Sequence, residues 1–211
     1  MRRIPKSDKP LVNDIQRFFS DVFRAEVYKD KGKEYWYAEY RETWLRSLGL
    51  DKGAAPEKIA SRTTKKLQEI LEKKYKGRIK KEALVAEGMT FRFEPLEGIA
   101  DNREGDETSK YSKFDILDTE TGSVYEISLS DAWHEFFKDV LKALLDARVK
   151  RLYICMRNHK YKGYKKSGFI KVRDSVMVQQ YISLARLYKL DIYLVDICPA
   201  CNDQGPSARY D

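Results

Sequence analysis

The sequence has few of the residues that carry disulfide, zinc or membrane chemistry. It contains three cysteines and two histidines in 211 residues, and an odd cysteine count does not suggest a disulfide framework. Cys198 and Cys201 form one CPAC pair, which supplies two of the four ligands that a structural zinc site needs. No run of 18 or more apolar residues is present, so no membrane-spanning helix is expected.

The first residues, MRRIPKSDKP, are basic, but no apolar segment of the kind found in secretory signals follows them. We therefore expect a cytoplasmic protein. Lys and Arg number 41 against 33 Asp and Glu, a formal net charge of +8, and the pI is near 9.2. This excess favours a polyanionic partner, nucleic acid before an anionic membrane surface. A hydrophobic content of 42% is sufficient for a packed core.

The first 52 residues have the apolar spacing of helices. In 11–28 one face carries Leu11, Ile15, Phe18, Phe19, Val22 and Phe23. The segment 33–50 continues this spacing and ends after Gly49. We predict a helical N-terminal subdomain over 1–52. It either packs on the core or serves as an arm for DNA recognition or dimerisation.

From residue 53 to 211, helical and strand patterns alternate. Pro56 and Gly77 bound a predicted helix. Strands are predicted at 89–94, 114–117 and 123–129, the last two joined by a turn at Gly122. A helix at 133–149, a strand at 150–156, a helix at 176–191 and a strand at 192–197 follow. This order predicts an α/β fold with a mixed sheet flanked by helices.

The predicted hairpin at 113–130 carries two acids among apolar neighbours. By strand alternation, Phe114 and Ile116 point to one side while Asp115 points to the other. Pairing through the turn would bring Asp115 close to Glu126. Two adjacent carboxylates repel unless one is protonated or a cation lies between them. Mg²⁺ typically takes one or two protein carboxylates plus phosphate oxygens, which suggests metal-assisted hydrolysis of a phosphodiester. A surface hairpin with solvated acids is the alternative.

FD at 114–115 and EIS at 126–128 resemble the PD-(D/E)xK nuclease motif. The predicted order over about 56–156, helix, three strands, helix and strand, also resembles the common core of that superfamily. Its members include type II restriction endonucleases, Holliday junction resolvases and repair nucleases. The resemblance implies an endonuclease that uses Mg²⁺ or Mn²⁺, with Asp115, Glu126 and the backbone carbonyl of Ile127 as ligands. It also implies that Glu57 is an additional acid on the leading helix.

Ser128 departs from the motif, because the family usually has Lys at this position. A Ser hydroxyl supplies no positive charge. Either Ser128 itself takes the place of the lysine in catalysis, as other polar residues do in some members of the superfamily, or the cation comes from the next helix, where Lys138 lies one turn after His134. A catalytically silent protein that only binds DNA is a further possibility. A structure-specific nuclease of the resolvase kind is the alternative to a restriction-like enzyme acting on double-stranded DNA as a homodimer.

Residues 157–173 form the most basic loop that we predict, and aromatic residues interleave with its cations. Clustered cations neutralise phosphates, and aromatic rings stack on bases. We therefore predict that this loop contacts DNA through Arg157, Lys160, Lys162, Tyr164, Lys165, Lys166, Lys171 and Arg173.

Overall fold

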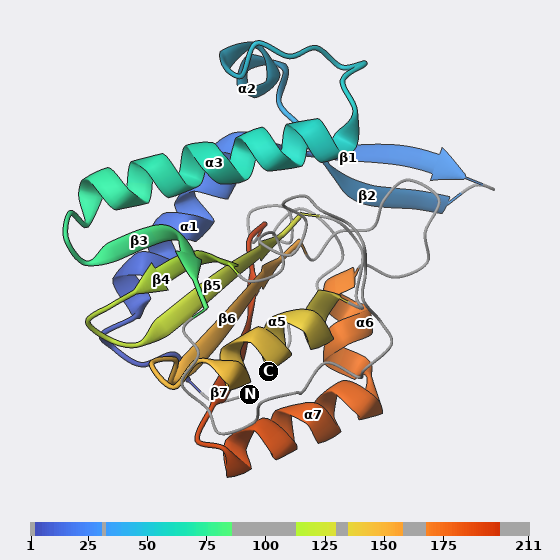
Figure 1. The fold of residues 1–211 in the computed structure, drawn as a ribbon. Coiled ribbons are helices and arrows are strands. Elements are labelled where there is room, and N and C mark those ends of the chain that lie inside the picture. The colour runs from blue at the N-terminus through green and yellow to red at the C-terminus, as the bar shows by residue number, and fades with distance from the viewer. Residues whose placement is uncertain (1–2, 31–32, 86–112, 130–134, 158–167, 199–211) are drawn as a thin grey trace, which may run out of the picture.

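The computed structural model describes residues 3–30, 33–85, 113–129, 135–157 and 168–198 (Figure 1). The N-terminal elements are α1 (Lys9–Val22), β1 (Phe23–Asp30), β2 (Lys33–Tyr40), α2 (Glu42–Ser47) and α3 (Pro56–Lys74). They are followed by β3 (Ile79–Leu84), β4 (Lys113–Asp118), β5 (Ser123–Ser128), α5 (Glu135–Leu145) and β6 (Arg151–Met156). The last elements are α6 (Gly168–Asp174), α7 (Val176–Leu187) and β7 (Asp191–Asp196).

The main sheet is mixed, as predicted. Its five strands lie in the order β3-β4-β5-β6-β7. Antiparallel pairing joins β3 to β4 and β4 to β5, whereas β5, β6 and β7 run parallel. The two parallel steps require crossover connections, and α5 and α7 lie in these connections. The predicted strand at 89–94 lies outside the described residues, and the strand that pairs with β4 is β3.

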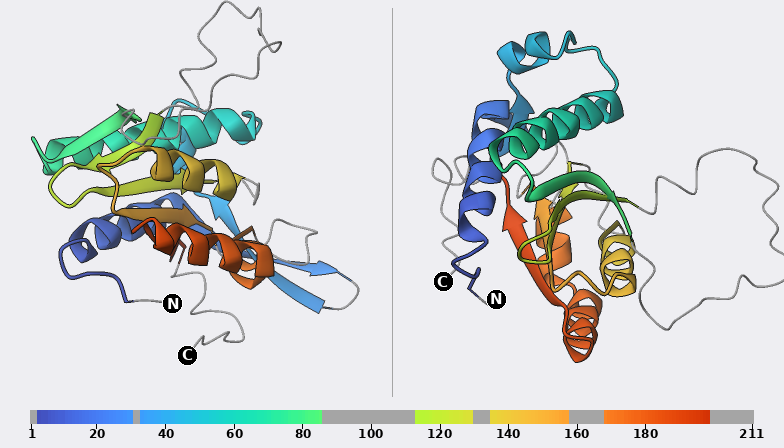
Figure 2. Two further views of the ribbon diagram at one scale, coloured as in Figure 1. Left: turned by 60° about the horizontal axis from the view of Figure 1, so that its bottom comes forward. Right: turned by 60° about the vertical axis from the view of Figure 1, so that its left-hand side comes forward.

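Each face of the sheet is covered by helices, and each forms its own apolar core (Figures 1 and 2). On one face α1 and α3 pack against the sheet, with Leu11, Ile15, Phe19, Leu67, Leu71, Ile116, Tyr125, Tyr153 and Tyr193 among the buried residues. On the other face α5, α6 and α7 pack, with Phe114, Leu117, Val124, Phe136, Val140, Ile154, Val172 and Ile182. Because α1 shares its core with the sheet, the N-terminal region is not a separate subdomain.

The all-helical prediction for residues 1–52 is wrong between 23 and 40. These residues form an antiparallel hairpin, in register from Phe23 opposite Tyr40 to Asp30 opposite Lys33. The hairpin extends away from the body of the molecule (Figure 2). Aromatic residues are frequent in this segment, and they favour strands as much as apolar helical faces. The apolar spacing of α1 therefore continues in the sequence beyond Val22, although the backbone becomes extended from Phe23 onward.

A local irregularity lies across β3 and β4. Phe114 belongs to the core under α5 and Ile116 to the core under α3, so the prediction that both point to one side is wrong. Opposite Asp115, Glu82 of β3 has a φ of 45°, a conformation that non-glycine residues rarely adopt. The regular alternation of side chains is therefore interrupted at the position of Asp115.

Candidate active site

Asp115 and Glu126 lie at the place where β4 and β5 separate. Regular pairing between the two strands ends at Ile116 opposite Tyr125, one step before the two acids. Beyond that point the Asp115 carboxylate replaces the backbone as the partner of β5, because Oδ2 accepts a hydrogen bond of 2.8 Å from the Ile127 amide. The two carboxyl groups are also close enough that the charge of Asp115 raises the pKa of Glu126. The two acids therefore converge, as the hairpin pattern predicts.

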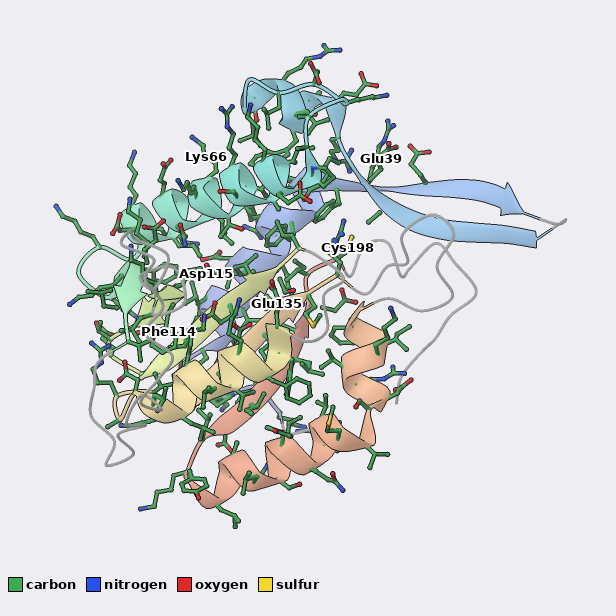
Figure 3. All side chains as sticks on the ribbon, turned by 45° about the vertical axis from the view of Figure 1, so that its right-hand side comes forward. Glu39, Lys66, Phe114, Asp115, Glu135 and Cys198 are labelled. Carbon is green, nitrogen blue, oxygen red and sulfur yellow. The ribbon has the colours of Figure 1, made fainter. Side chains whose placement is uncertain are left out.

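The backbone of Asp115 is held by the helix on the other side of the strand. Gln68 of α3 is buried, and its Nε2 donates a 2.9 Å hydrogen bond to the carbonyl oxygen of Asp115. Figure 3 shows Asp115 beside α3. This contact satisfies a carbonyl that lies where the strand pairing is interrupted. Asp115 is thus fixed at both its main chain and its carboxylate.

A buried lysine completes the cluster. Lys142 of α5 is 8% exposed, and its Nζ lies 2.6 Å from Glu126 Oε1. The same ammonium lies 3.1 Å from Asp139 Oδ1 and donates to the carbonyl oxygen of Lys113 at 3.1 Å. Asp139 is buried as well. The three polar contacts of Lys142 with described residues are thus to oxygen acceptors, and two of these belong to buried carboxyl groups.

The surroundings change the protonation of the three acids. Although Asp115 keeps partial exposure, burial raises its pKa to about 6 against the opposing effects of the Ile127 amide and Lys142. Burial raises the pKa of Glu126 well above its ordinary value, and the charges of Asp115 and Asp139 add to this effect. Burial also raises the pKa of Asp139. Three acids share one nearby ammonium, so the cluster favours a further bound cation or proton.

Burial acts to lower the pKa of Lys142, but Glu126 and Asp139 outweigh it, and the pKa is raised. Lys142 is therefore charged at neutral pH. A buried cation beside paired carboxylates is the kind of arrangement that occurs at catalytic sites, although structural ion pairs produce it too.

The other predicted catalytic residues lie in different surroundings. Ser128 is buried at the end of β5. Lys138 is half-exposed, and its Nζ lies 3.9 Å from Glu135, so Lys142, one turn further along α5, is the lysine that bonds to Glu126. Glu57 is exposed in the first turn of α3. It precedes Gln68 by eleven residues, about 16 Å along the helix axis, and is not among the buried residues of α3.

Part of the predicted basic loop is helical. Lys171 and Arg173 belong to α6, where Arg173 Nε lies 2.7 Å from Asp174 Oδ1. Arg157 is 5% exposed, and its guanidinium lies over the ring of Phe23 at 5.4 Å. The prediction of Arg157 as a surface contact to DNA is therefore wrong. Lys160, Lys162, Tyr164, Lys165 and Lys166 lie outside the described residues.

Lys142, Asp139 and Gln68 are the residues that the sequence reasoning missed. Leu141, which has the helical spacing of an apolar-face residue on α5, is 48% exposed. The buried stripe instead runs through Phe136, Val140 and Ala143, with Asp139 and Lys142 beside it. Asp139 and Lys142 are an acid and a lysine three residues apart, but Glu135 and Lys138 have the same spacing on this helix, so the sequence does not mark which pair is buried.

Comparison of the chain with protein-family models, with curated proteins and with solved structures finds no match. The geometry of the cluster is therefore the basis for any functional conclusion. In the described part of the chain, no three or more His, Cys, Asp or Glu side chains are grouped so as to hold a metal ion. Cys198 is buried, and Cys201 lies outside the described residues. None of the described helices has the length and apolar character needed to cross a membrane.

Proposed function

We propose that this protein is a divalent-metal-dependent endonuclease of the PD-(D/E)xK type that hydrolyses phosphodiester bonds in duplex DNA. The observation that carries the proposal is the convergence of Asp115 and Glu126 from adjacent antiparallel strands, with a buried lysine on Glu126. The order α3, β3, β4, β5, α5, β6 supports it, because the resemblance described above implies this order for the superfamily core.

The donor set fits Mg²⁺ or Mn²⁺. Both ions prefer oxygen ligands, and Mg²⁺ commonly takes only one or two protein carboxylates because it keeps several waters. Asp115, Glu126 and the carbonyl of Ile127 are the groups that would hold the ion. When bound, such an ion lowers the pKa of a coordinated water and stabilises the negative charge that develops on the phosphate.

The residues around the two acids have separate roles in this proposal. The Ile127 amide and Gln68 fix the position of Asp115. Lys142 supplies the positive charge that Ser128 lacks, and Asp139 holds Lys142 near Glu126. A fixed ammonium beside the scissile phosphate would orient the attacking water or offset phosphate charge.

Cleavage of supercoiled plasmid DNA in the presence of Mg²⁺ tests the proposal. The variants Asp115→Asn and Glu126→Gln should cut at least about 100-fold more slowly, while their DNA binding in EDTA stays near that of the wild type. Tyr125→Phe, a neighbouring buried change, is the matched control and should keep full activity. Full activity in both acid variants would show that the site is elsewhere.

The DNA substrate separates the alternatives. Discrete fragments from linear duplex DNA support restriction-like cutting, and cutting restricted to four-way junctions supports a resolvase. DNA binding without cleavage in either metal supports a non-catalytic protein. Lys142→Met should reduce cleavage as strongly as Glu126→Gln, whereas Lys138→Met and Ser128→Ala should not. If Ser128→Ala instead abolishes cleavage, the role given to Lys142 is wrong.

A homodimer with one site for each DNA strand is also part of the proposal. The side chains of Met177, Tyr181 and Leu184 on α7 are exposed, and residues 175–185 include no charged residue. An uncharged apolar surface can pair with its own copy about a two-fold axis. Sedimentation of the wild type and of Leu184→Glu tests this, with a dimer expected only for the wild type. A wild type that stays monomeric at micromolar concentration contradicts it.

A further inference from the structure

The positive charge of the chain is concentrated on one helix and the strand that follows it. Residues 57–82, which include α3 and β3, hold ten Lys and Arg against four Glu, a net of +6, whereas the whole chain has +8. Among the exposed cations of this segment are five on α3 or just after it: Lys58, Arg62, Lys65, Lys73 and Lys76. We name these five residues the α3 ridge. Most of the formal net charge thus lies on one side of the molecule.

Most cations of the α3 ridge are not neutralised. Within the described part of the chain, the side chains of Lys58, Lys65, Lys73 and Lys76 have neither a hydrogen-bond nor an ion-pair partner. The guanidinium of Arg62 donates to the Leu48 carbonyl at 2.7 Å, which leaves its charge unpaired.

The other lysines of α3, and Lys81 of β3, have acidic partners. Lys74 lies 2.6 Å from Asp14, and Lys81 lies 3.0 Å from Glu72. Lys66 lies 3.9 Å from Glu69, and Figure 3 shows Lys66 on the outer side of α3. The ridge is therefore the part of the α3 surface whose positive charge is not neutralised by an acidic side chain among the described residues.

Helix α3 links the ridge to the candidate site. Lys65 is exposed on the outer face of α3, and Gln68, three residues later, is buried on the sheet side, where it holds the backbone of Asp115. From Lys58 to Lys73 the helix extends about 22 Å, which matches the axial rise of about six base pairs. A charged track of this length, on the outer face of the helix that positions Asp115, suits an extended polyanion.

We propose that the α3 ridge binds the sugar–phosphate backbone of the DNA duplex whose strand is cut at Asp115 and Glu126. The choice of DNA as the polyanion rests on the proposed nuclease function. An anionic membrane fits less well, because Ile70 is the one large apolar side chain that α3, described along its whole length, exposes. A helix that binds a membrane surface needs an apolar face to insert, and the apolar face of α3 is buried on the sheet.

Salt-dependent binding tests the proposal. The ridge variant, Lys58→Gln, Lys65→Gln and Lys73→Gln combined, keeps good helix formers. The control variant, Lys150→Gln, Arg186→Gln and Lys189→Gln combined, removes the same charge from exposed positions around the start of β6 and the end of α7. Binding of a labelled 20-base-pair duplex is measured by fluorescence anisotropy at several salt concentrations, with EDTA present so that no cleavage occurs.

The slope of log K against log salt should fall by about two to three in the ridge variant and by less than one in the control variant, because each lost phosphate contact lowers it by about 0.9. Equal losses in both variants, an unchanged slope in the ridge variant, or binding of anionic vesicles in place of the duplex would overturn the proposal. Ridge-dependent binding by a protein that cuts nothing would support the ridge and refute the nuclease. Cleavage that is unaffected in the ridge variant would refute the ridge alone.

Discussion

Removing the ammonium of Lys142 should destabilise the fold strongly, because it leaves buried carboxyl groups without a cation. In Lys142→Met the contacts at 2.6 Å to Glu126 and at 3.1 Å to Asp139 are lost while the volume is nearly kept. Removing one partner of a buried ion pair costs about 3–5 kcal/mol. For a chain of this size each kcal/mol lowers Tm by about 2–4 °C. A decrease of about 6–20 °C is therefore expected.

A double-mutant cycle separates this pair from unrelated damage. Glu126→Gln removes one of the charges that Lys142 neutralises, so the double variant should be more stable than the sum of the two single changes predicts, by at least about 1 kcal/mol. Lys138→Met, one turn earlier on the same helix and half-exposed, is the control and should change the stability by less than about 1 kcal/mol. Urea denaturation measures all four free energies of unfolding.

The pH dependence of Lys142→Met adds a second measurement. Burial raises the pKa values of Glu126 and Asp115, the latter to about 6. In the folded state these acids therefore hold protons that the unfolded chain releases, and the stability that they contribute is lost as pH rises. The deficit of Lys142→Met should shrink when the pH is lowered below about 6. Two results would refute the assignment of Lys142 as the neutralising cation. One is that the stability losses of Lys142→Met and Glu126→Gln add within about 0.5 kcal/mol in the double variant. The other is that the stability loss of Lys142→Met grows as the pH is lowered.

Three further changes test the packing around the sheet. Asp8 is buried and accepts hydrogen bonds from Ser123 and Tyr153; burial raises its pKa, but these bonds outweigh burial and the pKa is lowered. Asp8→Asn should therefore lose about 2–3 kcal/mol at pH 7. The difference should begin to shrink as pH falls below about 4 and vanish only below the lowered pKa of the folded state; a constant difference between pH 7 and 3 would contradict this. Tyr153→Phe should cost about 1–2 kcal/mol of stability. Tyr125→Phe should be neutral or stabilising, because the buried Tyr125 hydroxyl has no hydrogen-bond partner in the described part of the chain. Equal losses for the two variants in urea denaturation would contradict this difference between the two hydroxyls. Gly122→Ala should cost about 2 kcal/mol or more, because Gly122 has a φ of 65° and an added Cβ would lie 2.5 Å from a backbone carbonyl oxygen; a thermal denaturation midpoint equal to that of the wild type would contradict this.

The elements from residue 56 onward were largely predictable because their patterns are local. Helix α3 begins at the predicted Pro56, and β5, β6 and β7 are the apolar runs that the sequence indicates. The convergence of Asp115 and Glu126 was predictable as well, because a short turn around Gly122 sets a register that ends one step before these two residues. Strand type and hairpin register depend mainly on neighbours along the chain.

The remaining features depend on tertiary structure. The rotation of α5 about its own axis decides that Lys142 is buried while Leu141 is exposed, and the helical pattern alone fits either face. The aromatic residues between 23 and 40 suit a helix or a hairpin, and the choice of the hairpin depends on contacts at its base such as Phe23 with Tyr40. The sequence predicts Arg157 as a surface cation, whereas in the structure its guanidinium lies over the ring of Phe23, a residue distant in the chain.

The connection of Asp8 to the sheet has a consequence for the order of folding. Asp115, Glu126 and Lys142 come from one continuous stretch of chain, so their cluster assembles through short loops. Asp8, in contrast, bonds to Ser123 and Tyr153, which lie 115 and 145 positions further along the chain. Closing such large loops carries a high entropic barrier. Docking of α1 is therefore expected to follow formation of the strands, and a folding intermediate with Asp115, Glu126 and Lys142 in place but its N-terminal helix detached is the species to look for.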